Sequence, residues 1–431
     1  MKKITKTLNI YDIANNNSII KLNKDRDTAD NTHNTDNTYI TDNKYILLNT
    51  DNSLCTAGNL FFDIETTGFS RVSCYCYLIG AAYISYDNDN NSINNNNNNN
   101  SQLKLNIIQW LAESIEDEAA ILSEFDMFSQ LFSTLIHFNG DSFDIPFIKQ
   151  RARLHNIGLH IDNLISIDLY KHAKGLKSLL KLESYNQTSI EHFLGIHRDD
   201  IYTGGELIKI YKEYSTKTLV NDIRANHEHL LLLHNYDDVI GLVKLCCLTS
   251  YNSILSKQMT FDNLTYSEDG NITLVFRLSE HIPVSILLRD EDYVLRAEKD
   301  IIKFRCPFII DTLKFFYDNY KDYYYLPYED TAMHISVAAY VDSECKVKAT
   351  KENCYTKRHG AFIKMPAYSG DLPVFRKYYN EPGVYICLDK DANDKSLSDY
   401  DDNIIKSMLS TDIIQQTAYS IISLFCKNKT K

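Results

Sequence analysis

The sequence predicts an α/β fold with a mixed sheet flanked by helices, followed by a second domain of the α+β class. Three observations favour this fold class. The chain has 431 residues, which is long for a single domain. Strand-like and helical segments alternate from residue 59 to about 255, as they do in sheets covered by helices. From about residue 257 the pattern changes to short strands between acidic turns.

We accordingly expect a first domain over residues 59–256 and a second domain, of unknown function, over residues 257–431. Residues 1–58 are rich in Asn, Asp and Thr, and we expect this segment to be mostly flexible. One apolar patch within it predicts a strand near residues 39–48 that leads into the fold.

The first domain is expected to begin with strands, and helices follow. Strands are predicted at about 59–64, 77–86 and 103–111. An asparagine run lies within the polar stretch 87–102 and predicts a disordered insertion between the second and third strands. The remaining predictions are a helix over 116–132, a strand to 138, a helix after 144, and several helices over 176–255. In the second domain we expect strands at 272–276, 284–288 and 293–295, and a helix over 402–425.

Composition narrows the classes of protein that the chain can belong to. Its net charge of −12 argues against a strongly non-specific nucleic-acid binder, although bound metal ions can supply a positive field locally. The sequence contains no run of 18 apolar residues, so no membrane span is expected. No apolar segment follows the first lysines, so secretion is not expected. The ten cysteines lack disulfide or zinc spacing, so we expect reduced thiols in a cytoplasmic protein.

The first strand carries an unusual pair of acids, Asp63 and Glu65, before it stops at Gly68. Side chains alternate faces along a strand, so both carboxylates point to the same side. Two adjacent like charges are stable when a cation lies between them, and carboxylate oxygens suit Mg²⁺ or Mn²⁺. The alternative is a solvated acidic pair at the end of an edge strand.

Two further acidic segments follow. Asp144 is expected where a strand and an Asn-Gly turn lead into a helix, near the positive end of the helix dipole; a plain N-cap is the alternative. His234 and Asp238 are four residues apart on a long helix and share a face. Asp237 points elsewhere and is expected to be solvated or to act as a cap.

These three segments resemble the motifs of the DEDD superfamily of 3′–5′ exonucleases, which have the ribonuclease H-like fold. The likeness extends over residues 59–250 and is greatest to the bacterial YprB-type ribonuclease H-like domain. Asp63-Ile64-Glu65-Thr66-Thr67-Gly68 is similar to the first motif. The second and third motifs are matched by Phe138-Asn139-Gly140 with Phe143-Asp144-Ile145-Pro146-Phe147, and by Asn235–Val239.

The resemblance implies a metal-dependent nuclease that removes nucleotides from the 3′ end of single-stranded DNA or RNA. It implies two Mg²⁺ or Mn²⁺ ions that hold the attacking and the leaving oxygen, and no membrane partner. The implied metal ligands are Asp63, Glu65, Asp144 and Asp238, and the implied substrate-binding residues are Thr66, Asn139 and Phe143.

His234 departs from the family pattern. The tyrosine class of these nucleases has Tyr four residues before the last Asp, whereas the histidine class has His five residues before it. We interpret His234 as the group that orients or deprotonates the attacking water, with neutral imidazole as the working form. The alternative is an interior histidine that only hydrogen-bonds to the chain.

The second domain combines tyrosines with basic residues between Lys346 and Lys364. This pattern favours a surface for single-stranded nucleic acid, and a tyrosine-rich core beside a solvated basic loop is the alternative. Two other function classes stay open for the whole chain. One is a non-catalytic nucleic-acid-binding module that retains the fold, and the other is a ribonuclease H-type endonuclease, whose carboxylate layout differs.

Overall fold

A computed structural model describes residues 1–9, 54–86, 103–216, 219–390, 392 and 395–426. The chain divides into two compact units: Met1–Lys177 with Lys181–Ser250, and Ser178–Leu180 with Tyr251–Lys431. The main division therefore falls a few residues before the boundary expected at residue 256. The strand expected near 39–48 and the asparagine-rich insertion at 87–102 lie outside the described residues.

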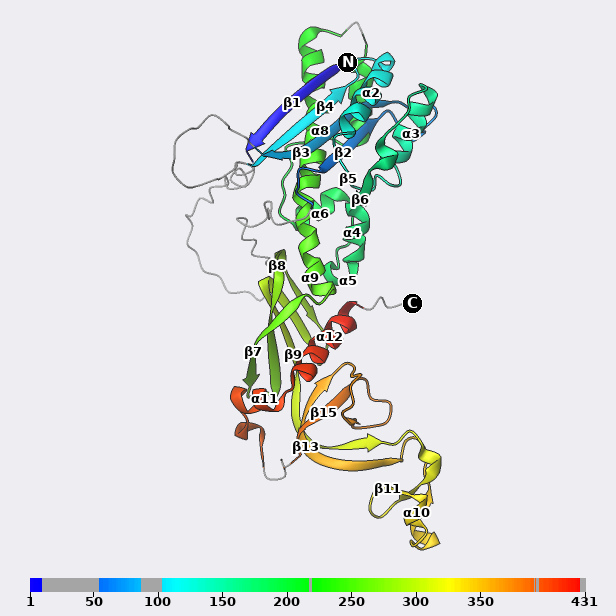
Figure 1. The fold of residues 1–431 in the computed structure, drawn as a ribbon, viewed down its shortest axis with the longest axis vertical. Helices are drawn as coiled ribbons and strands as arrows, with labels where there is room; N and C mark the ends of the chain where they lie inside the picture. Colours follow the sequence, from blue (N-terminus) through cyan, green and yellow to red (C-terminus); the bar gives the residue numbers. More distant parts are fainter. Residues whose placement is uncertain (10–53, 87–102, 217–218, 391, 393–394, 427–431) are drawn as a thin grey trace, which may run out of the picture. The chain divides into compact units, whose positions relative to one another are not determined.

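The first unit is built on a six-stranded mixed sheet in the order β1-β4-β3-β2-β5-β6 (Figure 1). Strands β2, β3 and β4 are antiparallel neighbours, whereas β5 and β6 run parallel to β2. The predicted mixed sheet is thus confirmed. Its strands are β1 (Lys2–Asn9), β2 (Asn59–Thr66), β3 (Cys76–Tyr86), β4 (Leu103–Leu111), β5 (Thr134–His137) and β6 (Ile165–Asp168).

Strand β1 pairs with β4 along its whole length and was not expected from the sequence. Its sequence, Lys-Lys-Ile-Thr-Lys-Thr-Leu-Asn, alternates residue types but contains few apolar side chains. An edge strand buries little, so its composition resembles that of a flexible polar segment.

Helices cover both faces of this sheet. On one face, Phe62 of β2 stacks on Phe125 of α2 with ring centroids 5.5 Å apart. On the other face, Asn235 of α8 donates a hydrogen bond to Asp63 of β2. The helices of the first unit are α2 (Glu118–Ser129), α3 (Asp144–Leu154), α4 (Leu169–Gly175), α6 (Gln187–Phe193), α7 (Gly204–Tyr214) and α8 (Asn221–Leu245), whereas the short α5 (Lys177–Leu180) belongs mostly to the second unit.

The long helical run Asn221–Leu255 contains α8 and is apolar enough, by length and composition, to cross a membrane. In its most apolar window 67% of the residues are buried inside the protein. Its buried positions include Leu231, Asn235 and Val239, which face the strands of the sheet.

The second unit contains a six-stranded antiparallel sheet in the order β14-β15-β13-β9-β8-β7 and a three-stranded sheet in the order β11-β10-β12. In place of the three short strands predicted over 272–295, the chain forms one long hairpin, because the ladder continues through register shifts instead of ending. The strands are β7 (Met259–Ser267), β8 (Asn271–Arg289), β9 (Val294–Phe316), β10 (Tyr323–Leu326), β11 (Thr331–His334), β12 (Val347–Lys348), β13 (Tyr355–Met365), β14 (Val374–Phe375) and β15 (Val384–Asp389).

The helices of the second unit are short except at the end. The helix predicted over 402–425 is split in two, because Leu409 has an extended backbone (φ −87°, ψ 120°). The helices are α9 (Asn252–Leu255), α10 (Ile335–Ala338), α11 (Asp402–Met408) and α12 (Thr411–Cys426).

The tyrosines and cations of the second unit contact one another and the backbone. The hydroxyls of Tyr325 and Tyr355 both donate to Oδ1 of Asp330, each at 2.5 Å, and Lys357 forms an ion pair with the same carboxylate. Lys346 donates to two backbone carbonyls. These contacts favour the alternative of a tyrosine-rich packing region over a free basic surface.

Candidate active site

The acids of the first motif lie where β2 extends beyond its parallel neighbour. The pairing of β2 with β5 ends at Phe61 and Ile136, so the stretch that carries Asp63 and Glu65 is not paired on that side. Alternation along β2 directs Phe62 into the apolar cluster under the sheet and Asp63 towards α8, where Asn235 Nδ2 donates to Asp63 Oδ2 at 3.3 Å.

Asp144 fills the space beside this free edge of β2. It is the first residue of α3 and is only 6% exposed. Its carboxylate accepts hydrogen bonds from its own backbone N–H and from that of Ile64. The turn before it is held in place by Asn139, which has a φ of 61° and donates its N–H to Asp168 Oδ1 at 2.8 Å.

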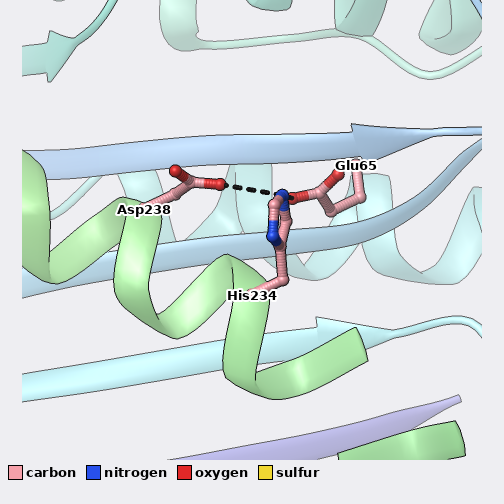
Figure 2. A group of neighbouring side chains, drawn as sticks. All are labelled: Glu65, His234 and Asp238. Atoms are coloured by element: carbon pink, nitrogen blue, oxygen red, sulfur yellow. Dashed lines mark ion pairs between the residues drawn. The ribbon is translucent and has the colours of Figure 1, made fainter. Parts of the chain in front are cut away.

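Helix α8 contributes the third pair of side chains. His234 Nε2 lies 3.3 Å from Asp238 Oδ2 and 3.7 Å from Glu65 Oε1. Figure 2 shows these three side chains converging from α8 and β2. One ligand atom from each lies within 4.8 Å of the others, so the structure brings the first and third motifs together as the sequence predicts.

Three carboxyl groups at this site, those of Asp63, Glu65 and Asp144, have raised pKa values. Burial, with the charges of Asp238, Asp144 and Glu65, raises the pKa of Asp63 well above its usual value. Burial raises the pKa of Glu65 to about 8, although His234 opposes the shift. Burial and the nearby acids also raise the pKa of Asp144, to about 7. Such a cluster carries its full charge only beside a strong cation.

The donor set fits hard divalent metal ions. Carboxylate oxygens dominate it, and Mg²⁺ and Mn²⁺ prefer such ligands to sulfur. Glu65, His234 and Asp238 form one candidate group of ligands, and the assignment of Asp63 and Asp144 as further ligands stays a prediction.

The imidazole of His234 is oriented by a second carboxylate on its other side. Its Nδ1 lies 2.6 Å from Oδ2 of Asp200, whose side chain is only 4% exposed. Burial lowers the pKa of His234, but the charges of Glu65, Asp238 and Asp200 outweigh it, so the net shift is upward. The ring is therefore fixed with Nε2 towards the candidate metal ligands.

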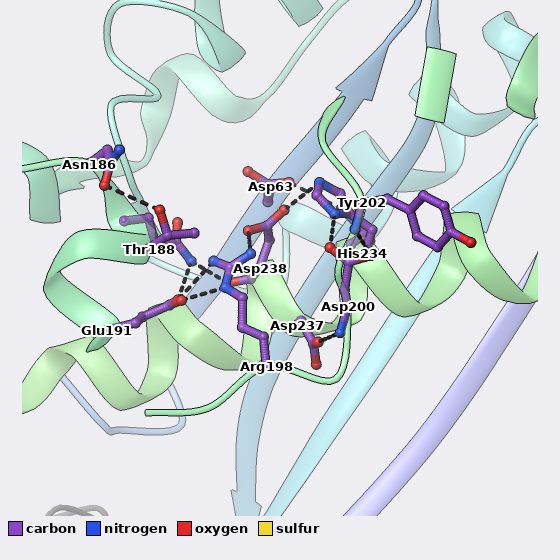
Figure 3. A network of polar contacts seen from close by, with 12 residues as sticks. Asp63, Asn186, Thr188, Glu191, Arg198, Asp200, Tyr202, His234, Asp237 and Asp238 are labelled. Carbon is purple, nitrogen blue, oxygen red and sulfur yellow. Dashed lines mark hydrogen bonds and ion pairs between the residues drawn. The ribbon is translucent and has the colours of Figure 1, made fainter. Parts of the chain in front are cut away.

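Three residues near the cluster were not assigned by the sequence analysis: Arg198, Asp200 and Asn235. Arg198 Nη1 lies 2.7 Å from Asp238 Oδ1, and Figure 3 shows this contact beside the one between Asp200 and His234. Arg198 and Asp200 lie in a loop whose partners on α8 are far away in the sequence, so no local pattern reveals their roles.

Asp237 binds the backbone of the loop that precedes α7 and caps no helix among the described residues. Its Oδ2 accepts the backbone N–H groups of Asp199 at 2.9 Å and Asp200 at 2.8 Å. The loop that carries Arg198 and Asp200 is thereby attached to α8.

The remaining predicted residues lie around the cluster. Thr66 uses its hydroxyl inside the following turn, where it donates to the carbonyl of Gly68 at 3.0 Å. Phe143 directly precedes Asp144 and packs edge-on against Phe69, with ring centroids 6.1 Å apart. The ring of Phe69 is 90% exposed. Substrate contacts of Thr66, Asn139 and Phe143 stay predictions.

In a second group of possible ligands, His137, Asp141 and Asp168, most ligand atoms already have partners within the protein, although Oδ2 of Asp168 has no hydrogen-bond partner among the described residues. His137 Nδ1 accepts the N–H of Gly140 at 3.0 Å, and its Nε2 lies 2.8 Å from a serine hydroxyl. Lys171 lies 2.5 Å from Asp141. This group therefore already has a cation, Lys171, at one of its carboxylates.

Residues 60–249 match the family model described as the RNase_H superfamily. Together with the mixed sheet, the match shows that the first unit has an RNase H-like fold. The matched segment is less than half of the chain. No curated protein matches this sequence.

Several solved structures resemble the chain at low sequence identity. A family B DNA polymerase from the archaeon Pyrobaculum calidifontis is 13% identical over 46% of this chain and 25% of its own, with a TM-score of 0.31. A product-bound exonuclease I is 12% identical over 56% and 58%, with a TM-score of 0.27. Exonuclease I from E. coli in complex with a dT13 oligonucleotide is 12% identical over 86% and 75%, also with a TM-score of 0.27. The chain thus spans less than two thirds of the first two structures.

Proposed function

We propose that the first unit is a metal-dependent 3′–5′ exonuclease of the DEDD superfamily and of the YprB type, acting on single-stranded DNA or RNA. The observation that supports this most strongly is the convergence of Glu65, His234 and Asp238, with Asp63 and Asp144 near enough for their charges to act on the same carboxylates. They come from three separated segments in the motif order of that superfamily, and the RNase H-like fold is the scaffold on which this order is found.

Mg²⁺ or Mn²⁺, when bound, would supply a Lewis acid that makes water a stronger nucleophile and stabilises the leaving oxygen. The protein contributes placement and charge. Asp63 is held by Asn235, Asp144 by the backbone of Ile64, and Asp238 by Arg198. These contacts orient the carboxylates before any substrate binds.

His234 is placed to orient the attacking water or to accept its proton. Its Nε2 faces the cluster, whereas Nδ1–H is held by Asp200. A histidine with one nitrogen held by a carboxylate keeps a single tautomer, and the carboxylate stabilises the imidazolium formed when the other nitrogen takes a proton. Asp200 is therefore a positioning residue for His234.

A pair of aromatic rings supports an unpaired nucleotide as substrate. Phe69 exposes its ring beside the first motif and packs edge-on against Phe143, whose chain neighbour is Asp144. Exposed rings stack on unpaired bases of any sequence, whereas the bases inside a duplex already stack on their neighbours.

The experiment is a degradation assay on 5′-labelled single-stranded DNA and RNA with Mg²⁺ or Mn²⁺. We expect successive shortening from the 3′ end, and loss of about a hundredfold or more in Asp63→Asn and Asp144→Asn, because metal clamps account for several kcal/mol of transition-state stabilisation. Both variants should fold. Asp222→Asn, an exposed acid in the first turn of α8, is the matched control and should retain activity.

Each alternative function predicts a different result in the same assay. Internal fragments would identify an endonuclease. Binding without metal-dependent cleavage would identify a non-catalytic module, and full activity in Asp63→Asn would refute the assignment of the site.

A further inference from the structure

Arg198 lies between the candidate ligand Asp238 and a buried acid, Glu191. Its Nη1 is 2.7 Å from Asp238 Oδ1. Its Nε and Nη2 bind the two oxygens of Glu191, the latter at 2.9 Å. The side chain of Glu191 is 2% exposed and that of Arg198 is 14% exposed. Figure 3 shows the guanidinium between the two carboxylates. Arg198 is thus a mostly buried cation with both acids as fixed partners.

Residues of helices α6 and α8 hold Glu191 and Asp238 close together. Gln187 of α6 donates to Glu191 Oε1 at 3.0 Å and to the backbone carbonyl of Asp238 at 2.9 Å. Gly241 of α8 leaves space for this contact, because a Cβ there would lie only 2.1 Å from Glu191 Oε1. The absence of a side chain at this position lets Glu191 approach the helix that carries Asp238.

We propose that Arg198 is a positioning residue that holds the carboxylate of Asp238 in the orientation in which it would bind a metal ion. The guanidinium occupies Oδ1, whereas Oδ2 faces His234 Nε2 at 3.3 Å and stays available to the ion. A planar guanidinium holds a carboxylate at a defined angle, which a flexible ammonium does not. Partners of this kind, which orient a ligand without touching the metal, strengthen metal binding. The inference rests on the proposed function, in which Asp238 binds metal.

The partners that surround Arg198 favour a role in positioning Asp238 over a direct contact with substrate. Glu191 and Asp238 take three of the guanidinium nitrogens, and only 14% of the side chain is exposed. Its replacement should therefore change the affinity for metal and, at limiting metal, kcat. It should leave the KM for the nucleic acid unchanged at saturating metal.

The test is a titration of the metal-free protein with Mn²⁺. Binding is measured by calorimetry and by the electron paramagnetic resonance signal of free Mn²⁺. In Arg198→Lys we expect the Kd for Mn²⁺ to rise about 10- to 100-fold, the usual effect of losing such a partner. Lysine keeps the positive charge but cannot bridge Glu191 and Asp238 with a planar fork.

Arg151→Lys is the matched control. Arg151 forms the same kind of buried fork with Glu118, at 2.8 and 2.5 Å, but it contacts none of the candidate ligands among the described residues. Both variants should lower Tm, because each weakens a buried ion pair. Only Arg198→Lys should weaken Mn²⁺ binding.

Glu191→Gln provides a second, more conservative variant if Arg198→Lys does not fold. It preserves the volume at residue 191 but removes the charge that holds Arg198, so Mn²⁺ binding should weaken in the same direction. Wild-type protein that binds no Mn²⁺ would refute the proposed function itself. Wild type that binds Mn²⁺, with unchanged Kd in a folded variant, would overturn this inference alone. A raised KM at saturating Mn²⁺ would also overturn it.

Discussion

At the scale of single residues, the imidazole of His234 is surrounded by acids. Asp200 holds Nδ1, and Glu65 and Asp238 face Nε2. Neutral imidazole is the working form expected from the sequence, whereas these three charges raise the pKa of His234. Cations bound to the same carboxylates would reduce this effect, because they offset the negative field that stabilises the protonated ring.

This environment leads to a prediction about titration. In metal-free protein, NMR should give His234 a pKa above its usual value of about 6.5, as the direction of its shift requires. Asp200→Asn should lower that pKa, because it removes one of the three charges. An unchanged pKa in this variant would show that Asp200 does not control the ring.

His234→Ala should reduce activity by about a hundredfold or more if the ring assists proton transfer.

Sequence reasoning can find the site residues that belong to local patterns, and it misses those whose roles depend on the fold. Asp63 and Glu65 are identifiable because an acidic pair in an apolar strand is unusual. Asp200 is not, because its partner His234 is 34 residues away. Arg198 likewise lies in a segment that resembles the family, but the sequence assigns it no role until the fold places it beside Asp238.

At the scale of secondary-structure elements, the position of α8 on the sheet depends on a glycine in β3. A Cβ at Gly80 would lie 2.0 Å from Asn235 Oδ1 and 2.9 Å from Val239 Cγ2. Asn235 also accepts a hydrogen bond from Gln109 of β4 at 3.0 Å and donates one to Asp63. The absence of a side chain at residue 80 thus allows α8 to approach the strand that carries the first acids.

Gly80→Ala should therefore affect both stability and activity. We expect the free energy of unfolding to fall by about 1–3 kcal/mol, the usual cost of adding volume to a packed core. Activity should fall as well, because α8 carries His234 and Asp238. Urea denaturation and the degradation assay measure the two effects.

Gly205→Ala is the control for this prediction. It lies in the first turn of α7 with no atom within 4 Å of the added Cβ, so stability should be unchanged or slightly higher. A Gly80→Ala variant as stable and active as Gly205→Ala would contradict the role of the close approach.

In the second unit, the question to test is whether the basic and aromatic residues bind single-stranded nucleic acid. Lys357 pairs with Asp330, and the guanidinium of Arg358 lies 5.6 Å from the ring centre of Phe375. Replacing Lys357 and Arg358 together by Ala should lower stability by about 0.5–1 kcal/mol per contact. Affinity for a single-stranded oligonucleotide, measured by fluorescence anisotropy without metal, should not change. A clear, salt-dependent loss of affinity would instead support the nucleic-acid surface.

At the scale of the whole molecule, sequence patterns predict the first unit better than the second. In the first unit, apolar runs end at turns, so β2, β3 and β4 fall close to their expected bounds. In the second, β8 and β9 are 19 and 23 residues long. Polar and charged residues on the exposed face of such strands resemble turns in the sequence, and only pairing with the neighbouring strand shows that they continue.

The carboxylates of the cluster repel one another when they are ionised. The stability of the fold should therefore depend on pH. The pKa values of Asp63, Glu65 and Asp144 are raised, the last two to about 8 and about 7. Above their usual pKa of about 4, the folded protein holds more protons than the unfolded chain. The stability from these groups is complete below that pKa and is lost as pH rises through 7 to 8. His234, whose pKa is also raised, acts in the same direction.

Metal-free protein should accordingly have a higher Tm at pH 5–6 than at pH 8, as measured by calorimetry in the presence of a chelator. Mg²⁺ or Mn²⁺ should raise Tm most at pH 8, because ions that bind only the folded state stabilise it and the carboxylates there are ionised. Asp63→Asn should flatten the decline, since it removes one of the repelling charges from the cluster. A Tm that rises steadily from pH 5 to 8 without metal, or an equally steep decline in Asp63→Asn, would contradict a charged cluster that requires cations to be stable.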